Sequence, residues 1–313
     1  MTDSARVPAL RVWIVAGRPW SFPASTMPVL FGTSLAVAAG GAPFRPLRFL
    51  LAMTAMVVLH AASNTLSDAF DFQRGLDRET TPLSGAVVRG WLRPNQAVCG
   101  AAVLFAAGVA LGLVLTLMSS PLLLVVGGAG VLIGAAYSLL KRCALGDLAV
   151  FLNFGILGAL GAWLVQAGSL SLIPALWTAP MAMLVAAILH ANNWRDAASD
   201  RALGVRSLAA VLGDRGSLVY YGFLLFGPFA VVVALMLVPR AAGGTLPALP
   251  WTFLLVFAAL PRAVSLFGRG LRRRTPRRPM DFAMLDGATA RYNLVFGLLS
   301  TAAVWLDLLA RRL

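Results

Sequence analysis

The chain has 313 residues, of which 59% are hydrophobic and only 12% are charged. A soluble domain carries about 25% charged residues, so this composition excludes an ordinary water-soluble protein. The two cysteines lack the spacing of metal ligands, which excludes a zinc site and a disulfide framework. The formal net charge of +14 is compatible with nucleic-acid binding, but the basic residues lie between apolar runs. We therefore expect membrane lipid as a partner and no nucleic acid.

Apolar runs long enough to cross a bilayer recur along the whole chain. A membrane-spanning helix needs about 20 apolar residues, and unbroken runs favour helices over the alternating strands of a β-barrel. The pattern predicts an all-α polytopic membrane helix bundle that forms one domain over residues 1–313. Hydropathy predicts about nine transmembrane helices, at residues 22–40, 47–66, 95–118, 121–140, 148–166, 172–194, 217–238, 251–268 and 290–310.

The distribution of Lys and Arg predicts the orientation of these helices. With the N-terminus in the cytoplasm, 21 of the 26 basic residues fall on the inner side, and the other five are Arg45, Arg48, Arg240, Arg311 and Arg312. Cytoplasmic loops of membrane proteins carry such an excess. We expect a multi-pass protein of the cell's inner (plasma) membrane, with a cytoplasmic N-terminus and an outer C-terminus.

The acidic residues gather on the same predicted side, with Asp307 as the one exception. The positive-inside rule does not explain this, because it is not a net-charge rule. We infer that the cytoplasmic face uses carboxylates for chemistry.

The first acidic cluster lies where the second predicted span ends. It reads Asn64-Thr-Leu-Ser-Asp68-Ala-Phe-Asp71 and continues to Asp77. Asn64, Asp68 and Asp71 are spaced i, i+4, i+7, so we expect one helix face to present all three.

The second acidic cluster lies at the end of the sixth predicted span. It reads Asn192-Asn193-Trp-Arg195-Asp196 and continues to Asp200. The spacing i, i+4, i+8 of Asn192, Asp196 and Asp200 again predicts a single helix face.

Paired carboxylates on adjacent turns repel one another and are costly in a membrane helix. A hard divalent cation between them removes that cost, and Mg²⁺ takes one or two carboxylates together with substrate phosphates. Two such motifs at one face therefore suggest Mg²⁺ that grips a diphosphate from both sides. For either motif alone, a solvated helix end paired with nearby arginines is the alternative.

Basic side chains near the acids are candidates for phosphate contacts, because arginine forks match phosphate oxygens. Lys141 is the only lysine among the 26 basic residues, and its compact ammonium can sit on a single phosphate oxygen or an acceptor oxyanion. For each arginine alone, a topology signal is the simpler explanation. The candidates are Arg74, Arg89, Arg195 and Arg206.

Together these motifs resemble the UbiA superfamily of intramembrane prenyltransferases, from Arg18-Pro19 to the ninth predicted span. The branch that prenylates 1,4-dihydroxy-2-naphthoate in menaquinone synthesis is the most similar. It shares the Arg-Pro opening, a loop that runs here from Tyr137 to Asp147, and a second motif followed here by Arg206-Ser207-Leu208. Ser67 and Val205 depart from the Asn and the Lys that are usual at these positions.

The resemblance implies nine helices around a central cavity that is open to lipid at one side. It also implies Mg²⁺-dependent transfer of a prenyl group from an isoprenyl diphosphate to an aromatic acceptor, with loss of carbon dioxide in the naphthoate branch. We expect catalytic roles for Lys141, Asp68 and Asp196. Expected substrate contacts are Asn64, Arg74, Arg89, Tyr137, Arg142, Asn193, Arg195 and Arg206. Expected Mg²⁺ ligands are Asn64, Asp68, Asp71, Asp77, Asn192, Asp196 and Asp200.

Three alternatives stay open at this stage. An intramembrane terpene cyclase would use the same metal site without an aromatic acceptor, and another aromatic or lipid acceptor would leave the chemistry unchanged. A transporter of an anionic lipid-linked substrate belongs to a different class. Transporters place their binding groups near the membrane midplane, whereas the acids here gather at one face.

Overall fold

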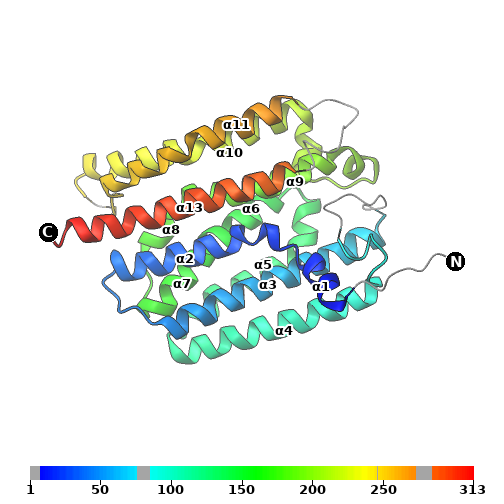
Figure 1. Cartoon of the computed structure of the whole chain (residues 1–313), viewed down its shortest axis with the longest axis horizontal. Coiled ribbons are helices and arrows are strands. Elements are labelled where there is room, and N and C mark those ends of the chain that lie inside the picture. Colours follow the sequence, from blue (N-terminus) through cyan, green and yellow to red (C-terminus); the bar gives the residue numbers. More distant parts are fainter. Residues whose placement is uncertain (1–7, 76–84, 245, 273–283) are drawn as a thin grey trace.

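The computed structural model describes residues 8–75, 85–244, 246–272 and 284–313, and nearly all of these residues are helical. Most helices lie roughly side by side in a single bundle (Figure 1). No strand forms within the described ranges, where one isolated bridge pairs Cys143 with Arg206. The predicted all-α class is confirmed. The elements are α1 (Ala9–Gly17), η1 (Pro19–Ser21), α2 (Pro23–Ala38), α3 (Pro46–Gln73), α4 (Pro94–Met118), α5 (Leu122–Arg142), α6 (Gly146–Val150), the π-helix η2 (Phe151–Leu157), α7 (Gly158–Ala167), α8 (Leu172–Trp177), α9 (Ala179–Ala202), α10 (Leu208–Ala241), the 3-10 helix η3 (Trp251–Ala259), α11 (Leu260–Leu271) and α13 (Leu285–Ala310).

Eight helical stretches among the described residues are long and apolar enough to cross a membrane, and α2 is a shorter apolar helix of 16 residues. Each of the nine matches one predicted span, which confirms about nine membrane helices. Three spans are composite, because short elements follow one another with little or no break. The eight are α3, α4, α5, α6 to α7 (Gly146–Ala167), α8 to α9 (Leu172–Ala202), α10, η3 to α11 (Trp251–Leu271) and α13.

Several predicted boundaries move outward. α9 continues to Ala202, eight residues past the predicted end at 194, and α3 continues to Gln73, seven residues past 66, so both acidic motifs are part of their helices. α13 begins at Leu285, five residues before 290. The Ser207 hydroxyl caps α10 by accepting from the backbone N–H of Ala210, but the helix is interrupted at Gly213 (φ 67°, ψ −174°), so the predicted start at 217 lies shortly after this break. Asp214, directly after the break, accepts a hydrogen bond from the Trp194 indole at 3.1 Å.

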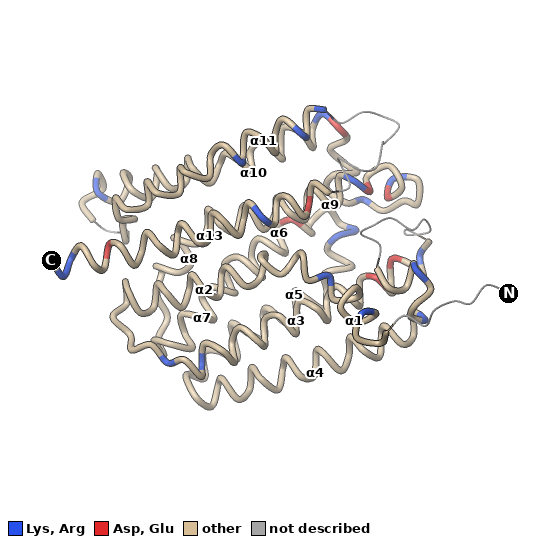
Figure 2. The backbone as a smooth tube through the Cα atoms, in the orientation of Figure 1, with Lys and Arg blue, Asp and Glu red and all other residues tan. Residues whose placement is uncertain are grey.

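The two ends of the bundle differ in charge. Figure 2 shows most acidic and many basic residues at the end where α1 lies, and the chain terminates at the opposite end beside Asp307 and Arg311. Arg262 departs from this pattern. It is one of the 21 basic residues predicted on the inner side, but it lies midway along η3 to α11 with an exposed side chain. A long arginine at that depth can extend its charged head toward the membrane surface.

Close helix packing depends on small residues, as is usual in membrane bundles. Gly32 of α2 lies against the backbone of α7, where an added Cβ would meet the carbonyl oxygen of Ala159 at 2.3 Å. The largest cluster of buried side chains lies between α2, α9, α10, η3 and α13, and includes Phe31, Trp194 and Tyr221. These contacts fix α2 and α9 on either side of the bundle interior.

Replacing Gly32 with alanine should destabilise the protein by about 1–3 kcal/mol, because the methyl group overlaps backbone atoms that cannot rotate away. The measurement is the thermal unfolding midpoint in detergent. Gly127→Ala is the matched control, since a Cβ there meets nothing within 4 Å. Equal midpoints for the two variants would contradict close packing of α2 on α7.

The orientation of the bundle in the membrane stays a prediction from the basic residues. A reporter that is active only outside the cytoplasm should be active after Leu313 and inactive when fused before α1. A cytoplasmic readout from the C-terminal fusion would show that the span count or the orientation is wrong.

Candidate active site

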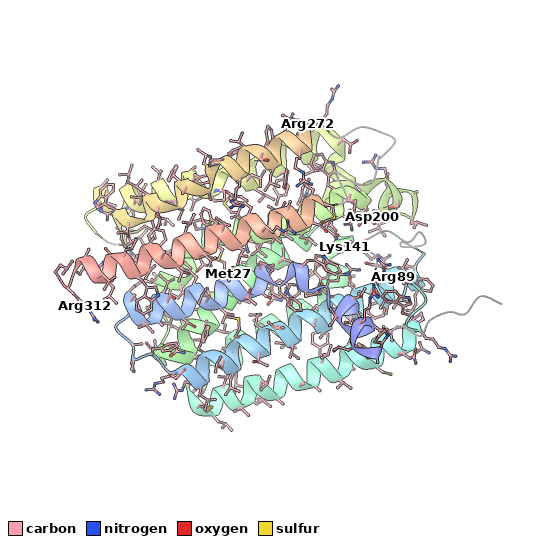
Figure 3. All side chains as sticks on the ribbon, in the orientation of Figure 1. Met27, Arg89, Lys141, Asp200, Arg272 and Arg312 are labelled. Atoms are coloured by element: carbon pink, nitrogen blue, oxygen red, sulfur yellow. The ribbon has the colours of Figure 1, made fainter. Side chains whose placement is uncertain are left out.

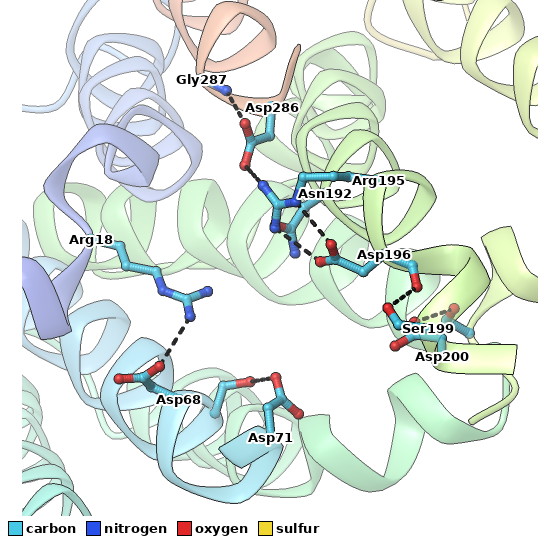
Figure 4. A network of polar contacts seen from close by, with 12 residues as sticks. Arg18, Asp68, Asp71, Asn192, Arg195, Asp196, Ser199, Asp200, Asp286 and Gly287 are labelled. Carbon is cyan, nitrogen blue, oxygen red and sulfur yellow. Dashed lines mark hydrogen bonds and ion pairs between the residues drawn. The ribbon is translucent and has the colours of Figure 1, made fainter. Parts of the chain in front are cut away.

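The two acidic motifs lie on α3 and α9 at the same end of the bundle and face each other across a central space (Figure 4). A cavity between them is lined by side chains of both motifs, namely Asn64, Asp71 and Asn192. Tyr137 and Lys141 from α5 complete one wall. The structure therefore brings together five of the predicted site residues from three helices.

Helical spacing explains which motif residues reach this cavity. Asn64 and Asp71 are seven residues apart, two turns on one face of α3, and both line it. Asn64 also donates to the carbonyl of Gly17 at 2.9 Å and to the hydroxyl of Ser21 at 3.1 Å. These bonds tie α3 to the Arg-Pro segment that precedes α2.

Asp68 is enclosed, although the sequence pattern placed it on the same face. Its side chain is 0% exposed, with Arg18 Nη2 3.5 Å from one carboxylate oxygen. The other oxygen accepts from the backbone N–H of Val87 at 3.0 Å. A Cβ at Gly85 would lie 1.9 Å from Asp68 Oδ1, so only glycine permits this close cover. A ligand in the cavity reaches Asp68 only if its present partners, which include Arg18 on the cavity wall, rearrange.

Asp71 and Lys141 form a bridge from α3 to α5 within the cavity wall. The ammonium nitrogen is 3.8 Å from Asp71 Oδ2, and both side chains are mostly buried. Ser67, which departs from the family pattern, places its hydroxyl 3.4 Å from the same carboxylate oxygen. Figure 3 shows Lys141 inside the bundle, at the end that also holds Asp200 and Arg89.

Arg195 organises the second motif. Its guanidinium donates two hydrogen bonds of 2.9 Å to Asp196 and a third of 2.5 Å to Asn192 Oδ1. A fourth, of 3.1 Å, reaches Asp286 on α13. Asp286 lines the cavity and also accepts from the backbone N–H of Gly287 at 2.8 Å. One cation thus joins three oxygen-bearing side chains from two helices.

A second, larger cavity adjoins the first and is almost entirely apolar. It lies between α3, α4, α5, η2 and α7, with walls such as Leu59, Phe105 and Val131. Glycines on three of these helices keep it open, namely Gly108, Gly112, Gly127, Gly128, Gly130, Gly134, Gly158 and Gly161. The combined space has a polar end that holds the acidic motifs and an apolar end of a size and character suited to a hydrocarbon chain.

Sequence comparison decides the family. Residues 25–303 match the profile of the UbiA prenyltransferase family. The chain belongs to this family. It is 33% identical over 301 residues to UbiA prenyltransferase domain-containing protein 1 of Danio rerio, covering 91% of this chain and 81% of that protein. The Homo sapiens protein of that name is 31% identical over 293 residues, with the same coverage of 91% and 81%.

Solved UbiA structures share the fold. An apo UbiA homologue from Aeropyrum pernix superposes with a TM-score of 0.64 at 19% identity, covering 93% of this chain and 98% of that one. A homologue from Archaeoglobus fulgidus, solved bound to DMAPP and Mg²⁺, gives a TM-score of 0.63 at 16% identity and covers 94% and 99%. The helix arrangement described above is therefore a UbiA fold.

The remaining residues that the UbiA resemblance suggested lie away from the cavity wall. Asn193 and Asp200 are buried, and Asp200 accepts from the Ser207 hydroxyl at 2.8 Å. Arg74 lies over the Phe70 ring and Arg89 over the Trp91 ring. Arg142 and Arg206 are exposed. The roles of these residues stay predictions, and Asp77 lies outside the described residues.

Sequence reasoning missed two charged residues on the cavity wall of this UbiA protein. Arg18 was noted only as part of the Arg-Pro segment, yet it pairs with Asp68 and lines the cavity. Asp286 begins α13 and carries no motif, so no local signal singled it out. One weak signal existed, because Asp286 is an acid on the predicted inner side close to a span.

Asp286→Ala should lower the free energy of unfolding by about 1.5–3 kcal/mol, because it removes a charged hydrogen bond from the partly buried Arg195. Asp307→Ala is the matched control. It breaks the Asp307–Arg311 pair, whose arginine is 63% exposed, and should cost less than about 1 kcal/mol. Thermal unfolding in detergent compares the two variants. An equal loss of stability in the two variants would mean that the bond from Arg195 to Asp286 on α13 stabilises the protein no more than a surface ion pair does.

Proposed function

We propose that this protein is a Mg²⁺-dependent prenyltransferase that moves a prenyl group from an isoprenyl diphosphate to an aromatic acceptor. One observation carries the proposal: the cavity that holds both acidic motifs continues directly into an apolar cavity. An isoprenyl diphosphate has the same two parts, a polyanionic head and a hydrocarbon tail. The DMAPP and Mg²⁺ in the Archaeoglobus fulgidus homologue support the choice of substrate and ion.

The donor set fits Mg²⁺. Asn64, Asp71 and Asn192 offer carboxylate and amide oxygens to the cavity, and Mg²⁺ prefers oxygen ligands with few protein carboxylates. Within the described ranges, no group of three or more Asp, Glu, His or Cys side chains lies close enough to hold a metal alone. That arrangement suits an ion whose coordination is completed by substrate phosphates. Asp68, Asp196 and Asp200 belong to the proposed ligand set through rearrangement of their present partners. Asp77, which lies outside the described residues, is also proposed as a ligand.

The bound ion would stabilise the negative charge that develops on the diphosphate as the allylic C–O bond ionises. Arg195 is held by Asp286 on α13 and bonds to Asn192, and we assign it to the phosphate oxygens. Lys141, on the opposite wall, would place a point charge on a single phosphate or acceptor oxygen. Both cations lie at the polar end. They would therefore stabilise the negative charge of the diphosphate leaving group and stay away from the prenyl cation.

The apolar cavity would hold the tail and exclude water from the allylic cation. Its walls come from α3, α4, α5 and α7, and polar side chains are scarce there. A water-free site prevents hydrolysis of a reactive intermediate. The electron-rich ring carbon of the acceptor can then attack at the boundary between the two cavities.

We propose 1,4-dihydroxy-2-naphthoate as the acceptor and the cytoplasmic face of the plasma membrane as the place of reaction. The acceptor is supported by the similarity of the Arg18 to Asp200 motifs to the naphthoate branch, and the orientation by the excess of basic residues on the predicted inner side. Menaquinone synthesis would be the corresponding pathway.

Purified protein with Mg²⁺ and prenyl diphosphates of several lengths tests the proposal. The acceptor panel contains naphthoate, hydroxybenzoate and homogentisate. We expect prenylated naphthoate and no product in excess chelator. A cyclic hydrocarbon formed from prenyl diphosphate alone would indicate a cyclase, and substrate movement across vesicles without diphosphate release would indicate a transporter.

Lys141→Arg should lower turnover at least about tenfold, a loss near 1.4 kcal/mol of transition-state stabilisation. The guanidinium is planar and bulkier, so it cannot reproduce the point charge 3.8 Å from Asp71. Lys141→Ala should lose more. Steady-state kinetics measure both, with the exposed Arg215→Lys as the control. Near wild-type turnover in Lys141→Arg would show that the residue only supplies positive charge.

A further inference from the structure

Four residues line both the polar and the apolar cavity, and we call them the neck: Ser63 on α3, Gly134 on α5, and Asn153 and Phe154 on η2. They lie where the two spaces join. Two of the four are polar, although one side of the neck is a hydrocarbon cavity. Asn153 lies in a π-helical turn, a feature frequent at functional sites.

The polar groups of the neck have no hydrogen-bond partner among the described residues. Neither the Ser63 hydroxyl nor the Asn153 amide bonds to another side chain or backbone group there, although both are close to α5. A Cβ at Gly134 would lie 3.6 Å from Asn153 Nδ2 and 3.7 Å from Ser63 Oγ. Both polar atoms therefore face the same small space beside Gly134. Their neighbours differ: His60 bonds to Ser25 at 2.8 Å, and Asn64 bonds to Ser21 and Gly17.

The depth of the neck separates it from the diphosphate site. Ser63 is eight residues before Asp71 on α3, and Gly134 is seven residues before Lys141 on α5. At 1.5 Å per residue these intervals are about 12 Å and about 10 Å along the helix axes. A diphosphate held at Lys141 and Asp71 therefore points its first prenyl carbons toward the neck, and the charged groups stay at the other end.

We propose that the neck is a binding subsite for a ring hydroxyl or ring carbonyl of the aromatic acceptor. This rests on the proposed function. The prenyl chain is a hydrocarbon and cannot bond to these groups, and the diphosphate is matched by Arg18, Lys141 and Arg195. A serine hydroxyl and an asparagine amide both donate and accept, so they pair with a neutral phenol. Phe154, whose ring centroid is 4.6 Å from that of His60, gives the neck an aromatic wall.

The neck would therefore determine which acceptor binds, without affecting the binding of the prenyl diphosphate. A phenol bonded at the neck would place the acceptor ring between the neck and the allylic carbon, from which the diphosphate leaves. The ring carbon next to that phenol is electron-rich, and it would be held within reach of the allylic carbon. Holding the two reactants in this orientation is itself a source of rate.

Two variants test the neck without disturbing the charged end. Asn153→Leu keeps the approximate size and removes the hydrogen bonds. Gly134→Ala adds a methyl group at ordinary contact distance from Asn153 and Ser63, so the helix packing is kept while the space beside both polar atoms is filled. Gly268→Ala on α11 is the matched control, because it lies outside both cavities and an added Cβ meets nothing within 4 Å.

The measurement is kcat/KM for the acceptor and for its methyl ether, together with KM for the prenyl diphosphate. Wild-type protein should prefer the free phenol by at least about tenfold, as expected for a site built to hydrogen-bond a hydroxyl. Both neck variants should lose about tenfold with the phenol and most of this preference, while KM for prenyl diphosphate stays within about twofold. Gly268→Ala should match wild type.

Unchanged acceptor kinetics in both neck variants, or an equal rise in KM for the prenyl diphosphate, would overturn the subsite while leaving the proposed function intact. A wild-type protein that consumes prenyl diphosphate but prenylates no acceptor in the panel would overturn the proposed function, and the subsite with it. The two failures are therefore distinguishable in one set of assays.

Discussion

Carboxylates inside a membrane bundle need partners that offset their negative charge, and this requirement determines how side chains are arranged at the polar end of this protein. An unpaired charge in a low-dielectric interior is costly, and most acids of α3, α6, α9 and α13 in the described structure have a basic side chain, an imidazole or a hydroxyl beside them. These pairings join helices that are distant in sequence, so they determine the geometry of the site as well as its stability. The pairs are Arg18–Asp68, Lys141–Asp71, Arg195–Asp196, Arg195–Asp286, His190–Asp147 and Ser207–Asp200.

The same constraint separates two kinds of space along the bundle axis. Charged and amide groups occupy one end of α3 and α5, and glycine and aliphatic residues occupy the rest. A substrate with an anionic head and a hydrocarbon tail can fill both spaces in only one direction. That direction passes its tail through the boundary, where Ser63 and Asn153 lie. The polar groups at one end of these helices and the small apolar residues along the rest thus favour one orientation of such a substrate before any specific contact forms.

The sequence alone determined the features that depend on local periodicity. Hydropathy gave the membrane helices, since a helix must bury its own backbone hydrogen bonds in lipid. Motif spacing placed Asn64 and Asp71 on one face of α3 and brought Asn192 to the same cavity. The solitary Lys141 stood out by composition, and it lies in the cavity wall beside Asp71.

Only the tertiary structure decided which groups meet across helices. Asp68 follows the same spacing rule as Asp71, but Gly85 and Val87 lie against its carboxylate and enclose it. Asp286 reaches Arg195 from 91 residues away in sequence, and no local pattern encodes that contact. Asn153 reads as one polar residue in an apolar run, and its place at the neck follows from packing of η2 against α3 and α5. Periodicity fixes which way a side chain points from its own helix, whereas the partner it meets depends on how separate helices pack.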